Sequence, residues 1–221
     1  MIFDLVRGGV GWEFNLILVV VFIFAMLIAL ITHEIAHGVV ALKCGDPSAK
    51  MAGRLSPNPI RHVDPLGLLS FCLIGLGWAK PVPVNPFNYR NFRRGNFLVS
   101  IAGVLTNLVI GFVASLLCYV VWKYSNHMSN VGLYGLFYFF YFLTFINISL
   151  VVFNLLPIYP LDGYNALVSF TKPDNRFMRF MRMNSSWILI VVILVLIFTG
   201  WIGIIRNGVV DGFMAFWRLM F

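Results

Sequence analysis

The sequence predicts an all-α polytopic membrane protein with about four transmembrane helices and one re-entrant or interfacial segment. Three observations lead to this fold class. Hydrophobic residues make up 60% of the 221 residues and charged residues only 11%, whereas a soluble domain carries roughly 25% charged residues. Several apolar runs reach the ~18 residues typical of a transmembrane helix. The basic residues cluster between those runs. The length fits one domain over residues 1–221, with its core at 14–170.

The apolar runs differ in length, and length separates spans from shorter segments. Four runs are long enough to cross a bilayer: 14–42, 96–122, 132–156 and 185–205. Residues 66–79 are apolar but would extend only about 21 Å as a helix, less than the ~30 Å of a hydrocarbon core. We therefore expect this segment to be re-entrant or interfacial. The tail, "DGFMAFWRLMF", places aromatic residues at helical spacing and predicts a helix on the membrane surface.

The charges of the loops predict an orientation. Four Lys or Arg residues lie in each of 43–65, 80–95 and 157–184, while 1–13 and 123–131 carry one each. The positive-inside rule places the three basic segments in the cytoplasm, provided that 66–79 does not cross. Both termini are then outside the membrane, which we expect to be a bacterial plasma membrane. The net charge of +8 is attributed to this topology, and no nucleic-acid partner is expected.

Three ionisable residues stand near the end of the first span, in "LITHEIAHGVVAL". Burying such groups in hydrocarbon is costly, so they indicate function. His33 and His37 are four residues apart and share one helix face. With Glu34 they form the H-E-x-x-H pattern, in which two histidines bind zinc and the glutamate acts as general base. The alternative is a pair of histidines bonded to neighbouring carbonyl groups.

A catalytic zinc takes three protein ligands, so a third is needed. Asp162, in "NLLPIYPLDGYNAL", is the best candidate. The span 132–156 runs in the same direction as 14–42, and its end therefore reaches the same side of the membrane as the two histidines. The alternative is a turn or N-cap aspartate before Gly163.

The two motifs resemble those of the site-2 protease family of intramembrane zinc metalloproteases, over most of residues 25–170. "HEIAH" is similar to the family's H-E-x-x-H, and "NLLPIYPLDG" is similar to N-x-x-P-x-x-P-L-D-G, whose aspartate is the third zinc ligand. "NPIRHVDPLG", "GWAKPVPVNP" and "SIAGVLTN" resemble segments of the small bacterial branch, which has no PDZ or CBS domain. One departure is Val104, which stands where the family usually has proline.

The resemblance implies a helical bundle whose zinc site opens toward the cytoplasm, with short extended strands beside it. It implies one zinc ion per chain and hydrolysis of a peptide bond within or next to a transmembrane segment of a membrane-protein substrate. His33, His37 and Asp162 are then the metal ligands, and Glu34 is the catalytic residue.

Four further polar residues have predicted roles. By resemblance, Asn107 and Asn154 face the active-site cavity and hold the substrate backbone or the oxyanion; interhelical hydrogen bonding is the alternative. His62 and Asp64 are possible supporting residues, for a loop over the site or for a second ion, with ordinary loop hydrogen bonds as the alternative. The prolines of "GWAKPVPVNP" favour extended backbone, which predicts an edge for a substrate strand or else a rigid turn.

The sequence therefore predicts an intramembrane zinc endopeptidase. A rival from another class is a non-catalytic membrane regulator, a pseudo-protease that binds transmembrane helices without cutting them. It predicts the loss of a ligand or of the glutamate, and all four residues are present. A metal transporter predicts further polar ligands along the other spans, and few exist.

Overall fold

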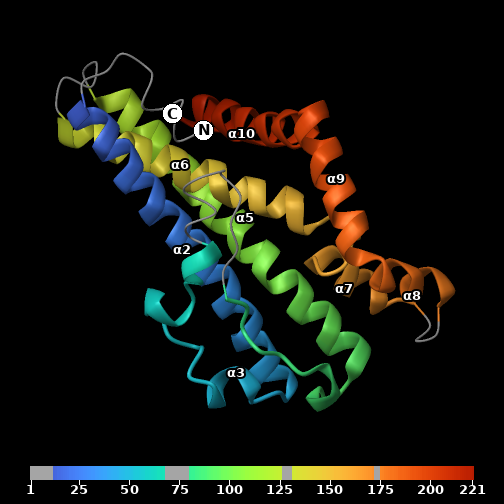
Figure 1. Ribbon diagram of the computed structural model, residues 1–221. Coiled ribbons are helices and arrows are strands. Elements are labelled where there is room, and N and C mark those ends of the chain that lie inside the picture. Colours follow the sequence, from blue (N-terminus) through green and yellow to red (C-terminus); the bar gives the residue numbers. More distant parts are fainter. Residues whose placement is uncertain (1–11, 68–79, 126–130, 172–174) are drawn as a thin grey trace.

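The computed structural model describes residues 12–67, 80–125, 131–171 and 175–221, and these form a bundle of helices (Figure 1). Three long helices make its body: α2 (Trp12–Cys44), α5 (Phe92–Tyr124) and α6 (Val131–Asn154). Each is long and apolar enough to cross a membrane. The predicted all-helical fold is confirmed. Helices α2 and α6 end within two residues of the predicted spans, and α5 begins four residues before its predicted span.

The three long helices pack on one another through apolar side chains. Phe22 of α2 meets Phe142 of α6 edge to face, with ring centroids 5.1 Å apart. Both rings belong to one buried cluster that also includes Ala114 of α5. Aromatic pairs of this geometry stabilise beyond their buried area alone. This packing fixes the relative positions of the helices, and with them the positions of the polar residues that α2 and α5 carry.

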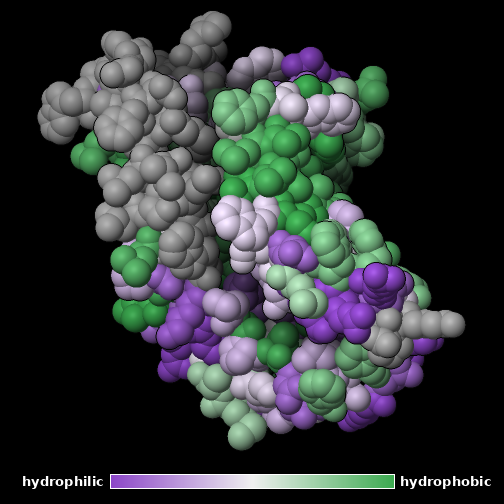
Figure 2. Space-filling model, turned by 45° about the vertical axis from the view of Figure 1, so that its right-hand side comes forward, coloured by the Kyte–Doolittle hydropathy of each residue, from purple (hydrophilic) through white to green (hydrophobic). Residues whose placement is uncertain are grey.

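The long helices alternate in direction, so their ends fall into two groups (Figure 1). The start of α2, the end of α5 and the start of α6 lie at one end, where Phe14 contacts Tyr134 and Lys123 donates to the carbonyl of Phe221. The end of α2 and the start of α5 lie at the other. Figure 2 shows hydrophilic side chains concentrated in its lower half and hydrophobic ones in its upper half. The second end is therefore the polar one.

Short helices and irregular backbone make up the polar end. They include α3 (Ser48–Met51), η1 (Pro59–Arg61) and η2 (Pro86–Asn88). The predicted strands are not formed in the described residues. The physical reason is that Pro81 and Pro83 have no amide hydrogen, and the amides of Lys80, Val82 and Asn85 bond to other parts of the chain. The predicted re-entrant segment, 66–79, lies almost wholly outside the described residues.

The C-terminal part contains α7 (Asp162–Val168), α8 (Arg176–Met183), α9 (Ser185–Thr199) and α10 (Trp201–Met220). The predicted span 185–205 is interrupted at Gly200, whose φ of 68° is left-handed and suits glycine. Helices α8 and α9 meet at 78°. The described residues thus contain three candidate spans, or four if this bent pair crosses as one.

The aromatic tail forms a helix as predicted, and part of its aromatic side contacts the bundle. Phe213, Phe216 and Trp217 of α10 all contact the ring of Phe112 on α5. The indole Nε1 of Trp217 donates to Ser115 Oγ at 2.8 Å. The helix therefore packs against the bundle, and its predicted place on the membrane surface stays a prediction.

Candidate active site

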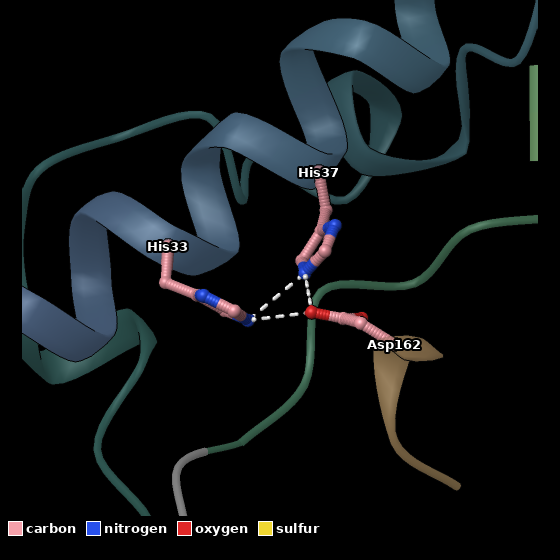
Figure 3. Close-up of side chains that lie close together, drawn as sticks. All are labelled: His33, His37 and Asp162. Atoms are coloured by element: carbon pink, nitrogen blue, oxygen red, sulfur yellow. Dashed lines mark hydrogen bonds and ion pairs between the residues drawn. The ribbon is translucent and has the colours of Figure 1, made fainter. Parts of the chain in front are cut away.

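The two histidines of α2 and the aspartate of α7 converge on one point (Figure 3). His33 Nε2 and His37 Nε2 are 3.0 Å apart, and each is 3.3 Å from Asp162 Oδ2. Ligand atoms that bind one tetrahedral zinc at about 2.0–2.1 Å are about 3.3 Å from one another. Both histidines are buried, and the aspartate side chain is only 14% exposed. These three residues therefore fit a zinc ion, with no movement of the helices required.

Helix α5 holds both imidazole rings from behind, through a stripe of residues four apart. His37 Nδ1 lies 2.7 Å from the carbonyl oxygen of Val99, and His33 Nδ1 lies 3.2 Å from Nδ2 of Asn107. Between them stands Gly103, where a Cβ would come within 2.5 Å of His33 Cε1 and 2.6 Å of His37 Nε2. Only glycine permits this approach. Helix α5 continues unbroken through Val104, where the family usually has proline.

Asp162 reaches the site through the turn that follows α6. It is the first residue of α7, and a Cβ on the next residue, Gly163, would overlap the carbonyl groups of Leu155 and Leu156. The turn folds back on itself this tightly because residue 163 has no side chain. Asn96 of α5 then donates from Nδ2 to the carbonyl of Asn165 at 2.6 Å, which ties α7 to the same helix that holds the histidines.

Glu34 stands beside the three potential ligands without belonging to them. It lines a cavity of about 460 Å³ together with His33, His37 and Asp162. Its Oε2 accepts a hydrogen bond of 2.8 Å from the backbone amide of Val82. The carboxylate is thereby held by the extended segment that forms the opposite side of the cavity, and Oε1 is left for other partners.

That extended segment is positioned by two residues whose roles the sequence did not predict. The carboxylate of Asp46 is fully buried and accepts from the Asn85 amide at 2.6 Å and from Asn88 Nδ2 at 2.8 Å. The guanidinium of Arg54, also buried, donates to the carbonyl groups of Lys80 and Pro81. Asp46 stands between glycine and proline in "KCGDPSAK", which is typical of an ordinary turn, and nothing in that pattern points to partners about 40 residues away.

Of the remaining predicted site residues, Asn154 lines the cavity, whereas Asn107, His62 and Asp64 do not. Asn107 does not line it and is fully buried behind His33. His62 is also buried away from the cavity, with Nε2 2.8 Å from the carbonyl of Ser56. Asp64 Oδ1 accepts from the amides of Leu66 and Gly67, and in the part of the chain that the structure describes it joins no second metal-ligand cluster.

Comparisons with known proteins point to the same chemistry. A model described as "Peptidase family M50" matches residues 123–198. "Putative zinc metalloprotease YwhC" of Bacillus subtilis (strain 168) is 36% identical over 154 residues, which cover 70% of each chain. "Putative zinc metalloprotease Rip2" of Mycolicibacterium smegmatis is 29% identical over 176 residues, or 77% of this chain and 64% of that protein.

A protein of the same name from Mycobacterium tuberculosis (strain H37Rv) is 29% identical over 163 residues, or 71% of this chain and 60% of its own length. No solved structure matches the chain. The geometry and the relatives define one class, and the chain belongs to peptidase family M50, the site-2 protease family of zinc metalloproteases.

Proposed function

We propose that this chain is an intramembrane endopeptidase that cuts a membrane-protein substrate within or next to a transmembrane segment. The observation that carries the proposal is the convergence of His33, His37 and Asp162 beside Glu34, in a cavity at the polar end of three candidate spans. A peptide that enters this cavity meets the ionisable side chains of α2, namely His33, Glu34 and His37.

One zinc ion per chain is proposed, held by His33, His37 and Asp162. When bound in such a site, zinc polarises a carbonyl group and lowers the pKa of water to about 7. Two neutral imidazoles and one carboxylate are a donor set that zinc accepts in hydrolases.

Glu34 is proposed as the general base. The proton of the attacking water passes to its carboxylate, and from there to the nitrogen of the leaving amine. The hydrogen bond from Val82 to Oε2 fixes the orientation of the carboxylate, so that Oε1 is the oxygen that takes the proton. A base held in this way needs no rearrangement at the moment of reaction.

The substrate is proposed to bind as an extended strand along residues 82–84. Val82 and Val84 both line the cavity, and residues two apart in extended backbone present their polar groups to the same edge. The Val82 amide is occupied by Glu34, whereas the Val84 amide has no partner among the described residues. Added-strand binding at such an edge would hold the peptide unwound. Asn154, which also lines the cavity, is proposed to hold its backbone or the oxyanion.

The polar end is proposed to face the cytoplasm of a bacterium, with both termini outside, because the basic segments lie at that end. A cysteine in place of Phe87, which is 92% exposed, tests this in a chain without its three native cysteines. An impermeant thiol reagent should label it in inverted vesicles and leave it unlabelled in intact cells. Labelling of intact cells would reverse the orientation.

The catalytic proposal is tested by Glu34→Gln, which preserves size and removes the base. Purified wild type should cleave single-span membrane substrates, and a zinc chelator should stop it. The glutamine variant should keep its zinc and bind substrate, and should cleave about 10²–10⁴-fold more slowly. A non-catalytic binder predicts no cleavage by either protein. Undiminished cleavage by the variant would contradict the role of Glu34.

A further inference from the structure

Asn107 lies on the far side of His33 from the cavity and contacts the ring nitrogen that does not face Asp162. Its side chain is fully buried. Nδ2 lies 3.2 Å from His33 Nδ1, and Oδ1 has no hydrogen-bond partner among the described residues. We propose that Asn107 is a positioning residue, whose amide oxygen accepts from His33 Nδ1–H and so presents Nε2 of His33 to the metal. This inference rests on the proposed function, because it requires that His33 binds zinc.

The chemistry of imidazole links the two ends of the His33 ring. A neutral imidazole carries a hydrogen on one nitrogen and a lone pair on the other. When an amide nitrogen faces Nδ1, that atom must accept, and Nε2 carries the hydrogen. A metal needs the opposite arrangement, with the hydrogen on Nδ1 and the lone pair on Nε2. The group that Asn107 presents to Nδ1 therefore decides whether Nε2 is free to bind zinc.

A half-turn of the Asn107 amide exchanges the two arrangements. The amide oxygen and nitrogen are nearly equal in size, so the turn needs no additional space in the packed interior. The present orientation leaves the amide oxygen without a partner among the described residues, so the turn breaks no hydrogen bond of that oxygen. Zinc on Nε2 requires a hydrogen on Nδ1 and an acceptor that faces it. Bound zinc therefore favours the orientation in which the amide oxygen of Asn107 faces His33 Nδ1. Zinc binding and the amide orientation of Asn107 are coupled.

His37 differs from His33 because the group that faces its Nδ1 is a main-chain carbonyl, which cannot turn to present a donor. Its Nδ1 faces the carbonyl oxygen of Val99 at 2.7 Å, and a carbonyl oxygen only accepts. Nδ1 of His37 therefore carries the hydrogen, and Nε2 is free. One face of α5 thus orients both histidines, His37 through a main-chain group and His33 through a side chain. Only the second can be removed by substitution.

The other role open to Asn107, donation to the substrate, would use the opposite end of the amide. Leucine removes both functions of the side chain at similar size. Aspartate keeps an acceptor for His33 Nδ1–H and loses the donor. The two variants together therefore separate positioning of His33 from contact with substrate. Asn147 on α6 provides a matched control. It is also fully buried with an unpartnered Oδ1, but its Nδ2 donates to Leu143 and not to a histidine.

The experiment measures zinc affinity by competition with a chromophoric chelator for purified wild type, Asn107→Leu, Asn107→Asp and Asn147→Leu. We expect Asn107→Leu to bind zinc about 10–100-fold more weakly, as loss of a hydrogen-bond partner of a ligand typically does. Asn107→Asp should stay within about threefold of wild type, and Asn147→Leu should be unchanged. Should Asn107→Leu not fold, the smaller Asn107→Ala takes its place, because it also removes the acceptor.

Three results are adverse. Wild-type affinity in Asn107→Leu would show that Asn107 does not position His33. Weak zinc binding by a folded Asn107→Asp would overturn the acceptor role in the same way. A wild-type protein that binds no zinc would instead overturn the proposed function itself, which distinguishes failure of the site from failure of this inference.

Discussion

The two sides of the active-site cavity are built differently. On one side α2 and α5 press together, so that His33 and His37 lie against the stripe Val99, Gly103 and Asn107. On the other side residues 80–85 run without regular secondary structure and are held by hydrogen bonds. The first side presents metal ligands, and the second presents the partner of Glu34 and an extended edge.

The difference shows how each side obtains its precision. On the helical side, the contacts recur at four-residue intervals along α2 and α5, so that helix geometry and the packing of the two helices together place the imidazoles. The extended side has no repeating ladder of its own. Its amide and carbonyl groups find partners on Asp46 and Arg54, because buried backbone groups must be bonded. We therefore expect the helical side to be disrupted by substitutions that overpack it, and the extended side by substitutions that remove its hydrogen bonds.

Of the substitutions that separate the two sides, Gly103→Ala should have the largest effect, and it acts on the helical side. The added methyl would lie within 2.5–2.6 Å of both histidine rings and must push them out of place. Overpacking of this kind costs about 1–3 kcal/mol, and zinc affinity should fall at least about tenfold, by 1.4 kcal/mol or more. Chelator competition and thermal unfolding measure the two effects.

Gly208→Ala is the matched control for that change. A Cβ at Gly208 of α10 meets nothing within 4 Å, so the same substitution should leave zinc affinity unchanged and stabilise the helix slightly. Equal zinc affinities for the two alanine variants would contradict the close approach of α5 to the histidines.

A smaller and different effect is expected from Asp46→Asn, which loosens the extended side. The variant loses the charge that strengthens the hydrogen bonds from Asn85 and Asn88, each worth about 1.5–3 kcal/mol. Zinc affinity should stay at the wild-type value, while kcat/KM for cleavage falls about tenfold, since the edge and the partner of Glu34 both shift. A parallel loss of zinc would show that the two sides are not independent.

The pH dependence of that effect sharpens the comparison. Burial raises the pKa of Asp46, but hydrogen bonds from the Asn85 amide, the Ser48 hydroxyl and Asn88 outweigh it, so the pKa is lowered. A lowered pKa stabilises the fold above the unfolded value of about 3.9, and the stabilisation is lost as pH falls through the folded value. Wild type should therefore exceed Asp46→Asn in stability at pH 7, with the gap shrinking below about pH 4. An equal gap at pH 7 and pH 3 would exclude the charge as its cause.

The helical side was largely predictable from sequence. The length of the apolar runs located α2, α5 and α6, and the spacing of His33 and His37 placed them on one face. Asp162 was identified first from the direction of the span that precedes it, and then from its resemblance to a family motif. Asn107 was singled out as a polar residue in a span, but its contact with His33 depends on which face of α5 meets α2, and apolar periodicity is weak in a helix that is hydrophobic all round.

The extended side was much less predictable. The prolines indicated extended backbone at 81–86, but not that Val82 would bond to Glu34, because that contact joins residues 48 positions apart. The break at Gly200 was missed because the residues on both sides of it are apolar and continue the pattern of a span. Local spacing carries information about helices, whereas partners distant in sequence are decided by the packing of the whole chain.

The zinc content of the purified protein tests the central claim most directly. Metal analysis of wild type, Asp162→Ala and Asp64→Ala compares a proposed ligand with an aspartate whose hydrogen bonds, among the described residues, are to its own loop. We predict one zinc per chain in wild type and in Asp64→Ala, and a large loss in Asp162→Ala. Zinc at the wild-type level in Asp162→Ala would contradict the proposed ligand set.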